Sequence, residues 1–171
     1  MGRLARAPSR AVSARPFGHV AGVAIGDAFE DRVALSAAGV HRPRRAGIWG
    51  TQTEGAQSIV LNCAFVDDED RGQTVLYTGS GGRHPRTGHQ ITDQTLTRGN
   101  LALAVSARRG LPVRVSRGVG TRVWSPPPEG YRYDGLYRVE DYYEAVGRNG
   151  YRIWRFRLRA VPGESILDAA V

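Results

Sequence analysis

The sequence predicts an α+β domain that is mainly β, built as a twisted sheet or partly closed barrel with one or two helices beside it. Three observations favour this class over a doubly wound fold. Short β-type segments recur along the chain, one segment has helical periodicity, and glycine and proline separate the segments. The 171 residues, including 22 glycines and 9 prolines, fit one domain with tails.

The first predicted strand covers residues 58–65. By the two-residue alternation of a strand, Ile59, Leu61, Cys63 and Phe65 fall on one face. Cys63 is the only cysteine in the sequence, so an internal disulfide and a multi-cysteine zinc site are both excluded. We expect this thiol to act as a small buried hydrophobe.

A helix is predicted near residues 97–107. Leu101, Ala104 and Val105 recur at helical spacing and share one face. Thr97 stands where an N-cap residue is expected, because a threonine hydroxyl can accept from the first free N–H groups of a helix.

Three further strands are predicted after the helix, at residues 113–115, 135–139 and 151–160. The last of them alternates clearly between apolar residues and arginines, which is typical of a half-buried strand. Its inner face is predicted to carry Trp154, Phe156 and Leu158, and its outer face Arg155, Arg157 and Arg159.

The chain divides into three parts. Residues 1–16 contain four arginines and no acid, which predicts a disordered basic arm that either lies along phosphates or is an uninvolved frayed end. Residues 17–161 form the predicted globular domain. Residues 162–171 carry no strong signal and are interpreted as a C-terminal tail.

The charge favours a polyanionic partner. The formal net charge is +8, from 24 basic and 16 acidic residues, and every basic residue is arginine. An arginine-only basic complement beside abundant alanine, glycine and valine is typical of a GC-rich bacterium. Apolar runs are too short to span a membrane, and no secretory signal is recognisable, so we expect a cytoplasmic, nucleoid-associated protein without a membrane partner.

Two motifs carry candidate chemistry. Residues 77–83, YTGSGGR, form a glycine-rich turn that lacks the lysine of a phosphate-binding P-loop but brings backbone close to a ligand around Ser80. Residues 67–70, DDED, do not match a calcium loop. They form either a solvated turn or, if the partner is DNA, a place where one carboxylate accepts from the amino group of cytosine.

Catalytic and cofactor chemistry is not predicted. The four histidines, His19, His41, His84 and His89, are scattered, so we expect no metal site and no cofactor. A zinc deaminase needs more than one cysteine, and a lysine nucleophile is excluded because the sequence has no lysine. The chain shows no nuclease, deaminase or methyltransferase motif, so we do not expect an enzyme.

Several segments, in order along residues 17–160, together resemble the bacterial type of the SRA (SET and RING associated) domain, also called the YDG domain. They are GVHRPRRAGIWG (39–50), SIVLNCAFVDDEDRG (58–72), YTGSGGR (77–83), RGNLALAV (98–105), RYDGLYRV (132–139) and YRIWRFRLR (151–159). The resemblance implies a twisted, crescent-shaped β-barrel of the PUA-like type with flanking helices. It also implies a module that binds duplex DNA and flips a 5-methylcytosine into a pocket.

The resemblance implies a set of pocket residues for the modified base. Phe65 and Tyr77 would stack on the flipped ring, and Asp68 would accept from its exocyclic amino group. The pocket floor and the loop that closes around the pyrimidine edge and its 5-methyl group would be formed by Ala64, Thr78, Gly79 and Ser80.

The rim departs from the pattern of the family. Phe65 stands where tyrosine is familiar, and Arg45 occupies the thumb position, where a small apolar residue is familiar. The finger region, residues 84–92, is several residues shorter, so a preference for hemimethylated sites does not transfer. Residues predicted to contact the duplex or its phosphates are Arg42, Arg45, Arg83, Arg86 and Gln90.

Three alternatives stay open. The chain could be the specificity subunit of a modification-dependent restriction system whose HNH-type nuclease is on another chain. It could be a PUA-like module that binds an unpaired RNA base. It could also bind DNA through its arginines alone, in which case binding is insensitive to methylation and steeply dependent on salt.

Overall fold

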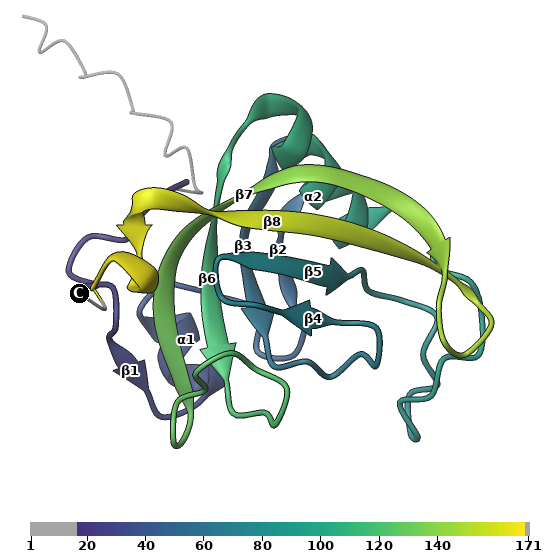
Figure 1. Cartoon of the computed structure of the whole chain (residues 1–171), viewed down its shortest axis with the longest axis horizontal. Helices are drawn as coiled ribbons and strands as arrows, with labels where there is room; N and C mark the ends of the chain where they lie inside the picture. The colour runs from purple at the N-terminus through teal and green to yellow at the C-terminus, as the bar shows by residue number, and fades with distance from the viewer. Residues whose placement is uncertain (1–16, 170–171) are drawn as a thin grey trace, which may run out of the picture.

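The computed structural model describes residues 17–169, so the predicted basic arm, residues 1–16, lies outside the described residues (Figure 1). The described chain is built around one sheet, with two α-helices and a short C-terminal 3₁₀ helix. In chain order the elements are β1 (Ala28–Phe29), α1 (Arg32–Ala37), β2 (Ile48–Thr51), β3 (Gly55–Leu61), β4 (Glu69–Asp70), β5 (Thr74–Thr78), α2 (Arg98–Arg109), β6 (Pro112–Gly118), β7 (Tyr131–Val146), β8 (Arg152–Ser165) and η1 (Ile166–Ala169).

The sheet has the order β2-β3-β6-β7-β8-β5-β4, and β1 pairs with β7. All pairs are antiparallel except β3 and β6, which run parallel. The long strands β7 and β8 arch across the molecule in Figure 1, with register shifts in β7 that allow the sheet to bend. The mainly β fold and its crescent shape are confirmed, although strand pairing within the described chain leaves the barrel open between β2 and β4.

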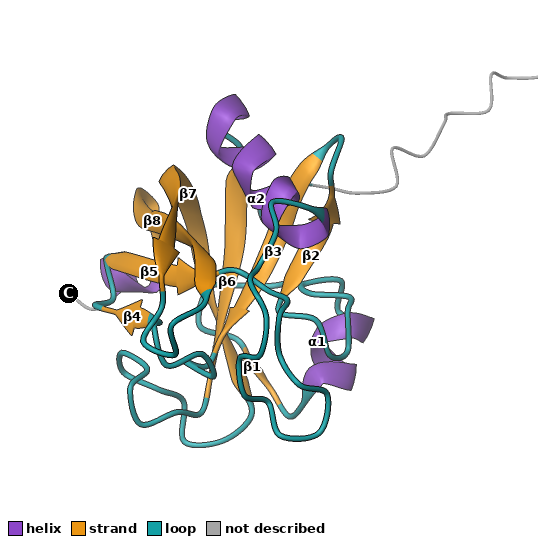
Figure 2. Cartoon of the chain, turned by 90° about the vertical axis from the view of Figure 1, so that its right-hand side faces the viewer, coloured by secondary structure: helices purple, strands orange, loops and turns teal. Residues whose placement is uncertain are grey.

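The core lies between α2 and the sheet. Helix α2 packs against β2, β3 and β7, as Figure 2 shows from the side. Leu103 on α2, Val115 on β6 and Phe156 on β8 are fully buried there. Each such side chain contributes about 1.5–3 kcal/mol of transfer free energy, so this cluster fixes the helix on the sheet.

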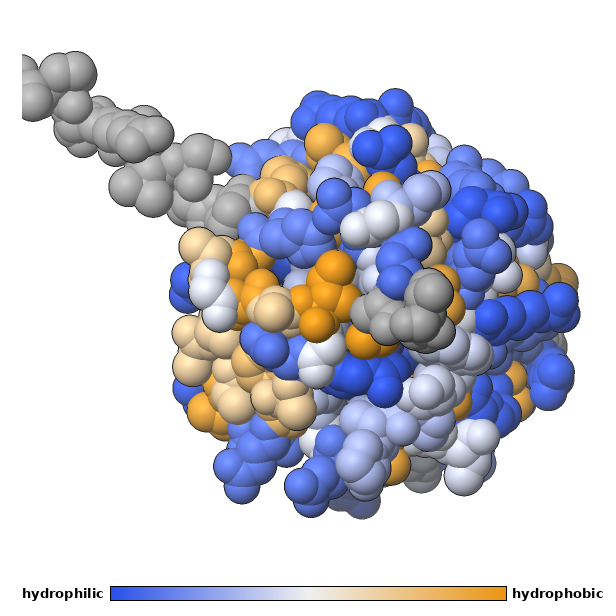
Figure 3. Space-filling view, turned by 60° about the vertical axis from the view of Figure 1, so that its left-hand side comes forward, coloured by the Kyte–Doolittle hydropathy of each residue, from blue (hydrophilic) through white to orange (hydrophobic). Residues whose placement is uncertain are grey.

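A smaller apolar cluster attaches α1 to the sheet. It is formed by Leu35 on α1, Val40, Val60 on β3 and Tyr133 on β7. The cluster fixes the segment that leads from α1 into β2, which borders the candidate site described below. Figure 3 shows one face of the molecule, on which a group of apolar residues lies next to hydrophilic ones.

The predicted helix and the last predicted strand are confirmed. The helix runs from Arg98 to Arg109, with Thr97 at the N-cap position. Thr97 makes no side-chain capping hydrogen bond, and Gly110 ends the helix in the left-handed conformation (φ 64°). In β8 Phe156 and Leu158 are fully buried, and Arg157 and Arg159 are exposed as predicted. The prediction is wrong for Arg155, whose side chain is only 17% exposed because its guanidinium donates to the Asp67 carbonyl (2.6 Å).

The predicted strand 58–65 is wrong in its second half, because β3 ends at Leu61. The Asn62 side chain accepts from the Ala64 N–H (3.1 Å), and Cys63 adopts a positive φ of 55°. This local turn competes with the strand ladder and takes Phe65 out of the alternation. The strand alternation therefore does not set the position of Phe65.

The strand β8 continues past the predicted domain boundary at residue 161, through Ser165. Ser165 pairs with Gly135, whose positive φ (97°) brings the two strands close at a bulge. Asp168 then accepts from the N–H and the hydroxyl of Ser165, each at 3.2 Å. Part of the predicted tail is thus joined to the sheet.

Candidate nucleic-acid interface

The loop between β3 and β4, residues 62–68, is held in place by one arginine, and we call it the cavity loop. The guanidinium of Arg122 donates to the backbone carbonyls of Cys63 (2.6 Å), Phe65 (3.0 Å), Val66 (3.4 Å) and Asp68 (3.0 Å). A segment without a ladder partner needs such donors for its carbonyl groups. Arg122 therefore sets the path of the backbone that carries the predicted pocket residues.

A cavity of about 140 Å³ lies between this loop and β5; we call it the base cavity. Four residues of the predicted pocket line it together, and they come from segments on both sides of the cavity. They are Ala64, Phe65, Asp68 and Tyr77. Two of the predicted duplex contacts, Arg45 and Arg83, also line it, at its rim.

Tyr77 forms one wall of the base cavity and is fixed at its far end. Its hydroxyl lies within hydrogen-bond distance of the carbonyls of Gly47 (3.2 Å) and Val60 (3.3 Å). Burial raises the pKa of this phenol well above its ordinary value. The ring is therefore a neutral, immobile apolar surface beside the cavity.

Phe65 also lines the base cavity, and its ring is stacked on a cation. The Arg83 guanidinium carbon lies 4.4 Å from the centroid of the Phe65 ring. Arg83 Nε donates to the Gly88 carbonyl (2.6 Å), and Arg83 pairs with Gln90 in an isolated β-bridge. The cation–π contact and the hydrogen bond together connect the finger region to the wall of the base cavity.

Asp68 supplies the buried polar group of the base cavity. Only 5% of the residue is exposed, and its Oδ1 accepts from the Thr78 backbone N–H at 2.7 Å. Burial raises the pKa of the carboxyl to about 6, while the hydrogen bond from Thr78 works in the opposite direction. At neutral pH the group is mostly an ionised acceptor that lines the base cavity.

The four acids at residues 67–70 point in different directions. Asp67 accepts from the Arg148 N–H (3.1 Å), and Asp68 faces the base cavity. Glu69 is exposed and lies 3.8–3.9 Å from two arginines. The Asp70 side chain is fully buried in an ion pair. The interpretation as a solvated turn is therefore wrong for Asp68 and Asp70, whereas Glu69 is solvent-exposed.

Asp70 lies in β4, directly after the cavity loop, and Arg117 joins it to the RYDG segment at residues 132–135. The fully buried Arg117 guanidinium donates to both oxygens of Asp70 (2.9 Å each) and to Asp134 (2.9 Å). Arg132 closes the network by donating to Asp134. Burial alone would lower the pKa of Arg117, but the hydrogen bonds that it donates to Asp70 and Asp134 leave it above its ordinary value. Asp134, the acid of the YDG motif, therefore has a structural role in this network and does not line the base cavity.

The rim segment, residues 42–46, is held from beneath. Arg32 at the start of α1 donates to the carbonyls of Pro43 (2.7 Å) and Ala46 (2.5 Å). Fully buried His41 contacts the Ala46 carbonyl through Nε2 (2.9 Å) and the Ser58 hydroxyl through Nδ1 (2.7 Å). Burial lowers the pKa of His41 to about 4, so the imidazole is neutral at pH 7.

Other predicted residues lie away from the base cavity. The Thr78 N–H reaches Asp68, but Gly79 and Ser80 are held by the side chains of Gln94 and Asn100, and Ser80 borders a separate depression. Arg86 is exposed in the finger turn, and Gln90 donates to the carbonyls of Gly81 and Thr92. Arg42 is exposed, with its guanidinium 5.9 Å from the Trp49 ring.

Sequence reasoning missed several residues of the site. Four that line the base cavity are Arg32, Gly47, Val60 and Asn62. Only Asn62 carried a local signal, since asparagine after a strand is typical of a turn. Arg122 lies 54 to 59 residues along the chain from the carbonyls that it binds, and Arg117 lies 47 residues from Asp70. No local sequence pattern could therefore reveal them.

Within residues 17–169, no group of three or more His, Cys, Asp or Glu side chains is placed to hold a metal ion. No helix in the same range is long and apolar enough to cross a membrane.

The model of the SAD/SRA domain family matches residues 16–164. The chain belongs to the SAD/SRA domain family. The E3 ubiquitin-protein ligase UHRF1 of Rattus norvegicus is 42% identical over 168 residues, which cover 86% of this chain and 22% of that protein. The E3 ubiquitin-protein ligase ORTHRUS 2 of Arabidopsis thaliana is 43% identical, over 79% of this chain and 22% of its own length. The chain thus spans about a fifth of these relatives.

Two solved structures are similar to this chain in fold. The modification-dependent TagI restriction endonuclease has a TM-score of 0.82 and 42% identity, over 86% of this chain and 53% of that one. The SUVH5 SRA domain bound to fully hydroxymethylated CG DNA has a TM-score of 0.75 and 37% identity, over 88% and 97%.

Proposed function

We propose that this SAD/SRA domain binds duplex DNA that carries a 5-modified cytosine and holds that base, flipped out of the helix, in the base cavity. The observation that carries the proposal is a cavity of about 140 Å³ that is lined by the buried Asp68 carboxylate together with two aromatic residues, Phe65 and Tyr77. The solved complex of the similar SUVH5 SRA domain with hydroxymethylated DNA supports the same ligand class.

The chemistry of the cavity suits cytosine and disfavours thymine. Cytosine presents an amino donor to Asp68, whereas thymine presents a carbonyl that an ionised carboxylate repels. Extrusion costs a few kcal/mol, and stacking on aromatic walls returns about 1–3 kcal/mol per base. Arginines at the rim and a net charge of +8 add attraction to phosphates. These terms together make binding of a flipped cytosine favourable.

In this proposal the chain reads DNA and carries out no bond chemistry of its own. The likeness to the TagI restriction endonuclease favours one role for such a reader, the specificity part of a modification-dependent restriction system with a nuclease partner of the HNH type. The finer assignments follow from that role: a bacterial, nucleoid-associated protein in the cytoplasm. Cleavage of modified DNA by the chain alone and with its candidate nuclease distinguishes a reader from a nuclease.

Competition binding at near-physiological salt tests the proposal. One duplex carries cytosine, 5-methylcytosine, 5-hydroxymethylcytosine or thymine at its centre, and single-stranded RNA serves as a further competitor. We expect preference for a modified cytosine in the wild type and its loss in Asp68→Ala. Equal binding to all four duplexes would show that the base cavity is not used, and displacement by RNA would favour the PUA-like RNA-binding alternative.

A further inference from the structure

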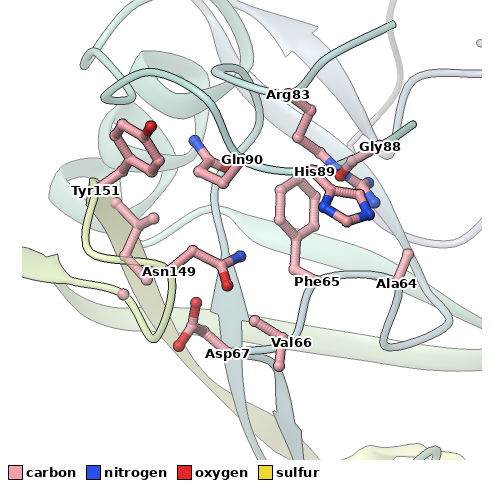
Figure 4. A pocket seen from close by; sticks show the side chains of 12 residues that line it. Ala64, Phe65, Val66, Asp67, Arg83, Gly88, His89, Gln90, Asn149 and Tyr151 are labelled. Carbon is pink, nitrogen blue, oxygen red and sulfur yellow. The ribbon is translucent and has the colours of Figure 1, made fainter. Parts of the chain in front are cut away.

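A second cavity lies behind the wall of the base cavity, between the finger region and the turn that joins β7 to β8. Its volume is about 200 Å³, and we call it the outer cavity. It shares Ala64, Phe65 and Arg83 with the base cavity, so a ligand in either cavity contacts the same wall. Figure 4 shows the side chains that line the outer cavity, Phe65 among them.

The outer cavity presents polar groups with spare hydrogen-bonding capacity. Asp67 accepts a hydrogen bond from the Arg148 N–H, but a carboxylate has about four acceptor positions. Among the described residues, the side chains of Asn149 and Tyr151 have no hydrogen-bond partner, although both line the cavity. In Figure 4 the Asp67 carboxylate and the Asn149 amide lie next to each other, facing the same space.

Apolar surface completes the cavity. Val66 is 40% exposed, and it lines the cavity together with the buried Ile153. The Phe65 ring adds an aromatic edge. A flat ligand with an apolar face and a hydrogen-bonding edge matches this combination, which is the description of a nucleobase.

The donor pattern selects among the bases. The outer cavity has a volume of about 200 Å³, against about 140 Å³ for the base cavity. Guanine presents two adjacent donors, its N1–H and its 2-amino group, which a carboxylate can accept together. Adenine presents an unprotonated ring nitrogen at the same edge, which Asp67 would repel.

We propose that the outer cavity takes a guanine that neighbours the modified cytosine and is itself extruded from the duplex. Asp67 would accept from the N1–H and 2-amino groups of this unpaired guanine. The proposal rests on the proposed function, because the neighbouring base reaches the outer cavity only when the modified cytosine occupies the base cavity. It makes Asp67 and Asn149 determinants of flanking-sequence preference, a role separate from the choice of cytosine by Asp68.

Inosine, which is guanine without the 2-amino group, provides the first test. Duplexes carry a central 5-methylcytosine with guanine or inosine at its 5′ or 3′ side, and unmethylated versions run in parallel. At one of the two positions we expect inosine to weaken binding about tenfold, the loss of one hydrogen bond to a charged acceptor. Inosine pairs more weakly than guanine, so easier extrusion cannot explain a loss.

Asp67→Asn is the matched variant. Its carbonyl oxygen can still accept from Arg148, so the turn is retained, and thermal unfolding checks this. Asp141→Asn is the control, because it removes the same charge from an exposed side chain on β7 whose partner is Arg157 (3.3 Å). We expect the guanine-to-inosine ratio to fall to about one in Asp67→Asn and to stay unchanged in Asp141→Asn.

A fluorescent guanine analogue that keeps both donors adds a direct readout. Its emission rises when the base leaves the stack, so we expect an increase with the wild type and not with Asp67→Asn. An intact preference for 5-methylcytosine with no guanine dependence at either position would overturn the inference and leave the proposed function standing. Loss of the preference for 5-methylcytosine itself in the wild type would overturn both.

Discussion

Replacing Asp68 with asparagine removes a buried negative charge while keeping the shape of the side chain and an acceptor for the Thr78 N–H. The change therefore tests two effects of the Asp68 charge: its effect on the choice of base and its effect on the stability of the free protein. We expect Asp68→Asn to lose the discrimination between 5-methylcytosine and thymine by about tenfold or more, because an amide can donate to the thymine carbonyl. We also expect the free protein to become more stable at neutral pH.

The magnitude of the stability gain follows from the pKa of Asp68. Burial raises it from 3.8 to about 6, so the folded state holds the proton more tightly than the unfolded state does. Below about pH 4 both states are protonated and the wild type carries no penalty. As the pH rises from about 4 to 6 its stability falls, and above pH 6 the loss reaches about 3 kcal/mol, at 1.36 kcal/mol per pKa unit.

Urea unfolding of wild type and Asp68→Asn at pH 4, 5, 6, 7 and 8 measures this difference. The two proteins should have similar free energies of unfolding at pH 4, and the variant should be more stable by up to about 3 kcal/mol at pH 8. A variant that is less stable than the wild type at pH 8, or a difference that does not change with pH, would refute the reasoning.

Three further predictions concern the groups that support the base cavity and the binding charge. Arg122→Ala removes four hydrogen bonds from the cavity loop, so it should abolish the preference for 5-methylcytosine in competition binding, whereas the exposed Arg148→Ala should keep it. Asp70→Asn breaks a fully buried ion pair and should cost about 3–5 kcal/mol of unfolding free energy by urea titration; less than about 1 kcal/mol would contradict the network. Affinity for unmodified DNA should fall with salt at a slope near −0.9 per neutralised phosphate, and a flat salt titration would exclude phosphate binding.

Much of the fold could be predicted because its signals are local. Alternation of apolar and polar residues locates β8, helical spacing locates α2, and ordered motifs identify the family. Residues that combine in such motifs, Phe65, Asp68 and Tyr77, also line the base cavity in the structure. Their roles in binding a base stay predictions until the DNA is tested.

Tertiary structure decided what local patterns could not. The four neighbouring acids, DDED, are alike in sequence, yet only the fold places Asp70 on Arg117, Asp68 in the base cavity and Asp67 in the outer cavity. The turn after Leu61, not the alternation, sets the position of Phe65. The sequence by itself therefore determined the family and the residue types of the site. Which carboxylate is buried, paired or free to bind depended on contacts between segments about 50 or more residues apart, which a periodic pattern does not encode.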